Sequence, residues 1–185
     1  MKDNYTFADI LVSKITVGNK SEFLKASKAK YDSYNSKDWA KIYFDEFSGG
    51  FNVYHNDHNF SKKGGGGDAE KIVGKMLAKY NGKQVEFLPE NSYQKSPDIN
   101  FDDQTWDIKL INNASEGTIR NYIKDARKAE NVIFYWDEND KLSELKNAVI
   151  RNIGYFKKKN TLNTMPNIYY MNKEGVLKSV FIRYP

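Results

Sequence analysis

The chain has 185 residues, which suits one domain of ordinary size with a core that needs no covalent staple. It contains no cysteine, so disulfides and thiolate zinc centres are excluded, and any metal must be held by oxygen or imidazole ligands. The formal net charge of +5 suits a polyanionic partner, although many basic proteins bind no nucleic acid. Residues 1–18 lack the pattern of a signal peptide, and no stretch approaches the roughly 18 apolar residues of a membrane span. We therefore expect a soluble protein.

Residues 1–40 are polar and rich in Lys, Ser and Asn, and we expect them to form an accessory segment. Within them, weak helical periodicity predicts one helix over residues 21–34. Residues 41–185 carry much sharper patterns, so we expect the functional domain there.

Hydrophobic periodicity and turn residues predict a regular succession of elements from residue 41 on. A glycine-turned hairpin precedes a helix, a strand, a second hairpin, a helix, a strand, a helix and two last strands. The expected ranges are 42–44 with 51–54, 68–80, 83–88, 99–101 with 105–111, 115–128, 131–136, 142–158, 167–171 and 176–183. The sum predicts an α/β fold with a mixed central sheet flanked by helices.

The second hairpin carries an acidic pattern. Because side chains alternate along a strand, Asp107 and Lys109 share one face, while Trp106 and its apolar neighbours occupy the other. Asp98 precedes the partner strand across a short turn, so we expect it beside this pair. Two adjacent carboxylates favour a cation between them, and hard oxygen ligands select Mg²⁺ or Mn²⁺. A metal there would activate water, and Lys109 would stabilise charge on a phosphate.

The preceding helix adds a third acid. Glu70 borders its apolar stripe, at the edge shared with Val73 and Leu77, so we expect the carboxylate to lean toward the site. The alternative interpretation is plainer, because Pro-Asp is a common loop sequence and Asp-x-Lys on a strand is often a solvated face.

At these residues the chain resembles the PD-(D/E)XK nuclease superfamily, which shares a core with type II restriction endonucleases. Pro97-Asp98, Asp107 and Lys109 match that motif in order and spacing, with Asp107 where many relatives have Glu. More narrowly, residues 49–136 resemble the C-terminal toxin domains of contact-dependent growth inhibition proteins and related polymorphic toxin and phage modules. The resemblance implies that Glu70, Asp98 and Asp107 hold the metal, with Zn²⁺ an alternative to Mg²⁺ or Mn²⁺, and that Lys109 assists the chemistry.

The resemblance further implies that residues 41–185 form a metal-dependent nuclease, for which we favour an RNase acting on tRNA as a toxin effector. It would act in the cytoplasm of a producing or target cell, with a cognate immunity protein as partner and an export route that the sequence does not reveal. Three alternatives stay open: a DNase of the same fold, an inactive nucleic-acid-binding or phage structural module, and a metal-independent RNase that uses Lys109 and a histidine.

Several further residues are candidates for smaller roles. Lys124, Arg127 and Lys128 follow the acidic motif on a helix, where they would guide phosphates or form a solvated face. His55 and His58, the only histidines of the sequence, lie in a loop and are either acid–base groups or solvated side chains. The run 64–67 of four glycines lacks the Gly-Lys-Ser/Thr ending of a P-loop, so it predicts a hinge and not an ATP site.

Overall fold

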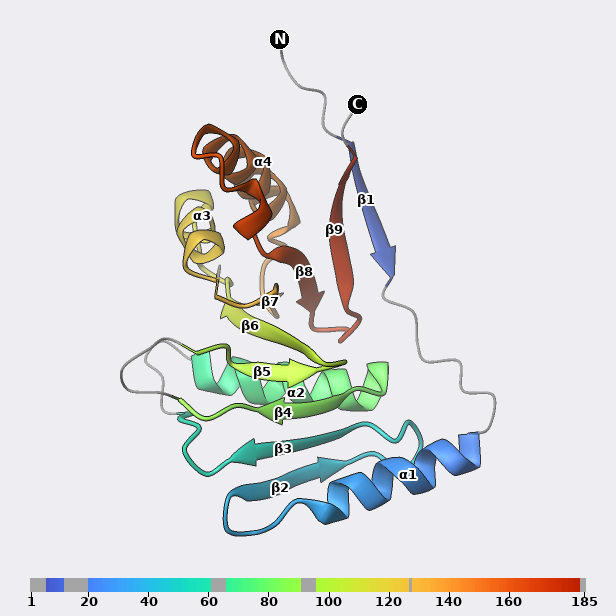
Figure 1. Cartoon of the computed structure of the whole chain (residues 1–185). Coiled ribbons are helices and arrows are strands. Elements are labelled where there is room, and N and C mark those ends of the chain that lie inside the picture. The colour runs from blue at the N-terminus through green and yellow to red at the C-terminus, as the bar shows by residue number, and fades with distance from the viewer. Residues whose placement is uncertain (1–5, 12–19, 61–65, 91–95, 127, 184–185) are drawn as a thin grey trace.

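A computed structural model of the chain describes residues 6–11, 20–60, 66–90, 96–126 and 128–183. In this described part, the strands form one nine-stranded mixed sheet in the order β1-β9-β8-β7-β6-β5-β4-β3-β2 (Figure 1). The elements in chain order are β1 (Thr6–Leu11), α1 (Lys20–Ser33), β2 (Trp39–Phe44), β3 (Phe51–His55), α2 (Gly66–Asn81), β4 (Gln84–Phe87), β5 (Ile99–Phe101), β6 (Gln104–Leu110), α3 (Glu116–Asp125), β7 (Asn131–Trp136), α4 (Leu142–Lys158), the short 3-10 helix η2 (Leu162–Thr164), β8 (Asn167–Asn172) and β9 (Lys178–Arg183).

Helix α2 covers one face of the sheet. Its residues Ala69, Val73 and Leu77 recur at helical spacing and are buried in a core cluster with Trp106 and Ile108 of β6. This packing determines which side of β6 is apolar, and with it which side carries the polar residues.

Helices α1, α3 and α4 lie over the opposite face. Helices α3 and α4 share a second core cluster with β7 and β8, while α1 packs over β2 and β3 through Tyr31 and Tyr34, whose rings contact Phe51. In Figure 1, α1 lies at one end of the sheet and α3 and α4 at the other, with β4 and β5 between them. Helix α1 reaches the edge of these middle strands, where Lys30 pairs with Glu86 of β4.

The β5–β6 hairpin turns at Asp102 and Asp103, whose φ angles are 52° and 57°. Two successive left-handed residues match the twist of a two-residue hairpin, and Asp tolerates this conformation better than most residues. The register pairs Ile99 with Trp106. The next antiparallel position therefore places Asp98 beside Asp107.

Most expected elements are confirmed, including the buried strand β7, the helix over residues 142–158 and the capping of α3 by Ser115, which accepts from Thr118 N. Two helices differ in length. Helix α2 begins at Gly66, so two glycines of the expected hinge are helical and the other two lie outside the described residues. Helix α3 ends at Asp125, before the expected 128.

The sequence patterns missed strand β1, which pairs antiparallel with β9. Its pairing partner lies at the other end of the chain, so local periodicity carries no sign of it. The expected boundary at residue 40 stays a prediction, although β1 and α1 both join the same sheet assembly. Within the described ranges, no helix is both long enough and apolar enough for a membrane crossing.

Candidate active site

Three of the four residues expected at the site lie together on the β5–β6 hairpin. Lys109 Nζ is 3.3 Å from Asp107 Oδ2 and 3.6 Å from Asp98 Oδ2. Asp98 and Asp107 are buried, at 8% and 7% exposure, while the Lys109 side chain is 24% exposed. The expected proximity of these residues is confirmed, and their catalytic role stays a prediction.

The backbone holds Asp98 firmly in place. Its N–H donates to Trp106 O at 3.0 Å, and its carbonyl accepts from Leu88 N at 3.0 Å. Its carboxylate Oδ2 accepts from Ile108 N at 2.8 Å. Asp98 is thus tied to both neighbouring strands, which gives a preorganised carboxylate of the kind that a metal or catalytic site requires.

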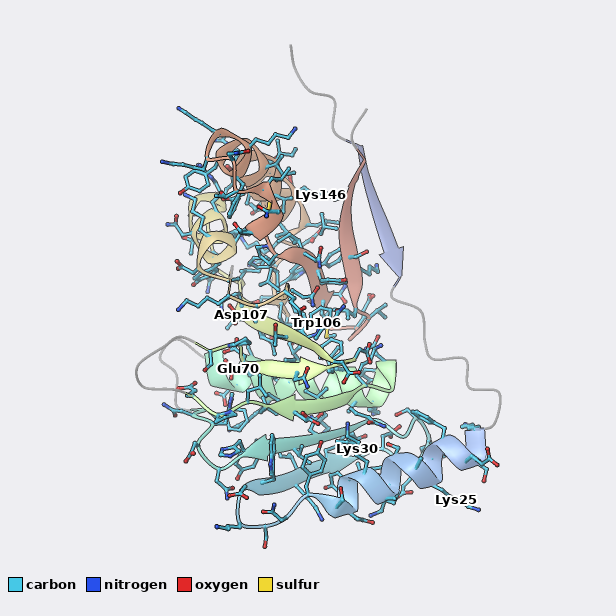
Figure 2. The ribbon with its side chains drawn as sticks, viewed as in Figure 1. Lys25, Lys30, Glu70, Trp106, Asp107 and Lys146 are labelled. Atoms are coloured by element: carbon cyan, nitrogen blue, oxygen red, sulfur yellow. The ribbon has the colours of Figure 1, made fainter. Side chains whose placement is uncertain are left out.

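Trp106 shows why Asp107 points away from the α2 core. The indole stacks on Phe101, with ring centroids 4.2 Å apart, and lies in the cluster that α2 covers. Adjacent residues of a strand project to opposite faces, so Asp107 projects to the side without α2. Figure 2 labels both residues on β6. The predicted division of β6 into an apolar face and a charged face is confirmed.

Glu70 has a different partner. It lies on α2, where Figure 2 labels it, and is 2% exposed. Its Oε2 lies 3.1 Å from Nε2 of His58. The other ring nitrogen, Nδ1, lies 2.7 Å from Leu88 O. A carbonyl and an ionised carboxylate both only accept, so either both nitrogens of His58 carry protons or Glu70 does. This buried pair is absent from the sequence-based expectations.

Aromatic rings enclose the imidazole of His58. The rings of Phe60 and Phe87 lie 4.4 Å and 5.3 Å away, and the His58 side chain is 0% exposed. His58 is therefore a core residue, not a solvated loop histidine. His55 keeps 22% of its side chain exposed, near Asp57.

The three-acid metal cluster expected from the sequence is not formed in the described part of the chain, where no group of three or more His, Asp or Glu side chains is arranged to hold a metal. The reason lies in the packing, because Glu70 comes from α2 and Asp98 and Asp107 project from the other face of the sheet. The two aspartates alone still fit Mg²⁺ or Mn²⁺. Such ions commonly use one or two protein carboxylates and complete their shell with water and phosphate.

The basic residues expected to bind substrate are distributed more loosely. Lys124 of α3 lies with its Nζ 4.5 Å from the ring centroid of Tyr155 on α4, and Lys128 is exposed beyond the end of α3. Arg127 lies outside the described residues. A role of these residues in substrate binding stays a prediction.

No family model matches the chain, and no curated protein matches it. A solved CdiA-CT/CdiI toxin and immunity complex from Burkholderia pseudomallei is similar, with 17% sequence identity and a TM-score of 0.43. The match covers 65% of this chain and 85% of that one.

Proposed function

We propose that this protein is a metal-dependent nuclease that hydrolyses phosphodiester bonds on a restriction-endonuclease-like, PD-(D/E)XK core. The observation that carries the proposal is the position of the Lys109 ammonium within 3.6 Å of two buried carboxylates, those of Asp98 and Asp107. All three lie on one face of a hairpin whose other face is packed core. The match of these residues to the nuclease motif adds support.

Asp98 and Asp107 would hold the metal, for which Mg²⁺ and Mn²⁺ suit the oxygen ligands. A metal bound there supplies an activated water and neutralises charge on the scissile phosphate. Lys109 donates to the phosphate oxygens as negative charge builds up on them. The bond from Ile108 N at 2.8 Å fixes the Asp98 carboxylate in place for this role.

For the substrate we propose RNA, with tRNA favoured over DNA, and for the biological role a toxin effector neutralised by an immunity protein. The net charge of +5 supports a polyanionic substrate, and the resemblance to contact-dependent growth inhibition toxins supports the role. A DNase of the same fold is the nearest alternative. A metal-independent RNase that uses His58 is disfavoured, since that side chain is fully buried against Glu70.

The test is cleavage of total tRNA and of plasmid DNA by the purified protein with Mg²⁺, Mn²⁺, Zn²⁺ or EDTA. We expect cleavage of tRNA that EDTA abolishes, and a loss of at least about a hundredfold in Asp107→Asn, since a metal supplies several kcal/mol of stabilisation. Asp57→Asn is the matched control, because the side chain of Asp57 is 75% exposed.

Each result separates the candidates. Cleavage that persists in EDTA would contradict the metal mechanism, and an active Asp107→Asn protein would contradict the site. Cleavage of plasmid DNA alone would select the DNase. Binding of nucleic acid without cleavage of any substrate would select the inactive binding module.

A further inference from the structure

A cavity of about 280 Å³ lies on the same sheet face as Asp98 and Asp107. Its floor comes from β4 and β5, with Gln84, Glu86 and Asn100, and α1 lines it with Phe23 and Lys30. Figure 2 shows Lys30 on the side of α1 toward the sheet and Lys25 on the outer side. Ligand pockets usually measure about 300–1,000 Å³, so this cavity is of a size for a small group.

Glu86 is the central group of the cavity, and its side chain is 20% exposed. Its Oε1 accepts from the Tyr34 hydroxyl, and its Oε2 accepts from Asn100 Nδ2 at 3.3 Å. Burial, and then the bond to Glu86, raise the pKa of Tyr34, so the phenol stays protonated as a donor. Each carboxylate oxygen has two acceptor sites, so Oε2 keeps one site for a ligand, and Oε1 gains one when Lys30, whose Nζ is 3.5 Å away, turns aside.

The rest of the lining favours a base over a phosphate. Asp102 and Asp103 line the same cavity and repel a second anion. Lys30 Nζ is 3.5 Å from Glu86 Oε1, which is long enough for the ammonium to turn toward another acceptor. The ring of Phe23 provides an apolar surface on which a base can stack.

The register links this cavity to the proposed active site. Glu86 pairs with Asn100 across β4 and β5, and Leu88 N bonds to Asp98 O two residues further along. Two residues along a strand span about 7 Å, and side chains two apart share a face. A phosphate at Asp98 therefore lies within one nucleotide's reach of Glu86.

We propose that this cavity is a guanine-binding pocket, in which one acceptor site on each oxygen of the Glu86 carboxylate takes the N1–H and the N2 amino group of a base joined to the scissile phosphate. Guanine offers two adjacent donors on its Watson–Crick edge. Adenine and cytosine place an acceptor beside their single amino group, which would face the second carboxylate oxygen. Lys30 provides a donor for O6. The inference deepens the proposed function and rests on it for the position of the phosphate.

The test compares short single-stranded RNAs that carry one guanosine, inosine or adenosine in a uridine tract, since inosine lacks only the N2 amino group. Binding is measured by fluorescence anisotropy in EDTA, and cleavage is measured separately with Mg²⁺. We expect the wild-type protein to bind the guanosine RNA roughly tenfold more tightly than the inosine RNA, as one charge-assisted hydrogen bond provides. Glu86→Gln should lose this preference, because an amide has only one oxygen to accept.

Glu46→Gln is the matched control, because Glu46 is exposed in the β2–β3 turn and should keep the preference. Thermal unfolding of each variant checks that the fold is intact. Equal affinity of the wild-type protein for guanosine and inosine would overturn the pocket, as would a guanine preference retained by a folded Glu86→Gln. Cleavage of tRNA without guanine preference would support the proposed nuclease and contradict the guanine pocket. Guanine preference in binding without cleavage of any RNA would support the pocket and contradict the nuclease.

Discussion

Two buried acidic groups lie on opposite sides of the same sheet, and their surroundings differ. Glu70 is closed in by α2, Phe60 and the ring of His58, and its partner's side chain has no exposed surface. Asp98 and Asp107 are nearly as buried, but Lys109 beside them keeps a quarter of its side chain in solvent. Of these two groups, the second has a charged side chain that reaches solvent.

Glu70 and His58 form a closed pair, and Asp98, Asp107 and Lys109 form an open group. The closed pair connects separate parts of the chain. His58 bridges α2, through Glu70, and the end of β4, through Leu88 O. Leu88 in turn bonds to Asp98, so the closed pair supports the open one through the backbone. Both groups of acids are buried, so burial alone does not distinguish them, and the exposure of the neighbouring cation does.

The largest expected effect comes from breaking the closed pair. His58→Leu leaves the Glu70 carboxylate buried without its imidazole, which should lower the free energy of unfolding by about 3–5 kcal/mol in urea titrations. The double variant His58→Leu with Glu70→Leu should recover much of this loss, because both polar groups are then removed. If His58→Leu kept its stability but no longer cleaved RNA, the structural role of the Glu70–His58 pair would be contradicted and a catalytic role favoured.

A somewhat smaller effect is expected at the open group. Lys109→Met should reduce the single-turnover cleavage rate by roughly 10²–10³-fold, the usual cost of one lost transition-state donor. Removal of the ammonium leaves two buried carboxylates side by side without their cation, so the thermal midpoint should also fall, and the rates are compared at a temperature where both proteins are folded. Lys141→Met is the control, because Lys141 also pairs with a carboxylate, that of Glu144, on a different element. Equal losses of cleavage rate in Lys109→Met and Lys141→Met would contradict a special role for the partly exposed lysine beside Asp98 and Asp107.

The smallest effect is expected at the helix beside the site. Lys124→Ala should weaken RNA binding by a few fold and lower the slope of log affinity against log salt by about one, as loss of one phosphate contact does. Lys25→Ala, an exposed lysine on α1, is the control and should leave the slope unchanged. If the salt dependence of RNA binding were unchanged in Lys124→Ala, the lysine would make no phosphate contact, and its contact with the Tyr155 ring would be structural.

Local signals were sufficient for most of the elements. Alternation along β6 separated Asp107 and Lys109 from Trp106, and the short turn after β5 placed Asp98 beside them. Ser115 marked the start of α3, and the continuous apolar run of β7 marked a strand buried on both faces. These features depend on residues close in the sequence, so periodicity and turn chemistry predict them.

Glu70 illustrates the limit of such signals. Its place beside the apolar stripe of α2 predicted a carboxylate that leans toward the aspartates, but helical periodicity does not say which sheet face the helix covers. Packing of α2 against Trp106 and Ile108 directed Glu70 to His58 and away from the aspartates.

By itself, the sequence determined the succession of helices and strands from residue 41 on and the charged face of one hairpin, because both follow from the geometry of neighbouring residues. Only the tertiary structure decided the pairing of β1 with β9, the burial of His58 against Glu70, and the contact of Tyr34 with Glu86 across 52 residues. These contacts join segments that lie far apart in the sequence, so the local pattern of one segment does not indicate its contact with the other. They form because the sheet brings distant edges and faces together, and the apolar area buried there outweighs the entropy of closing the loops.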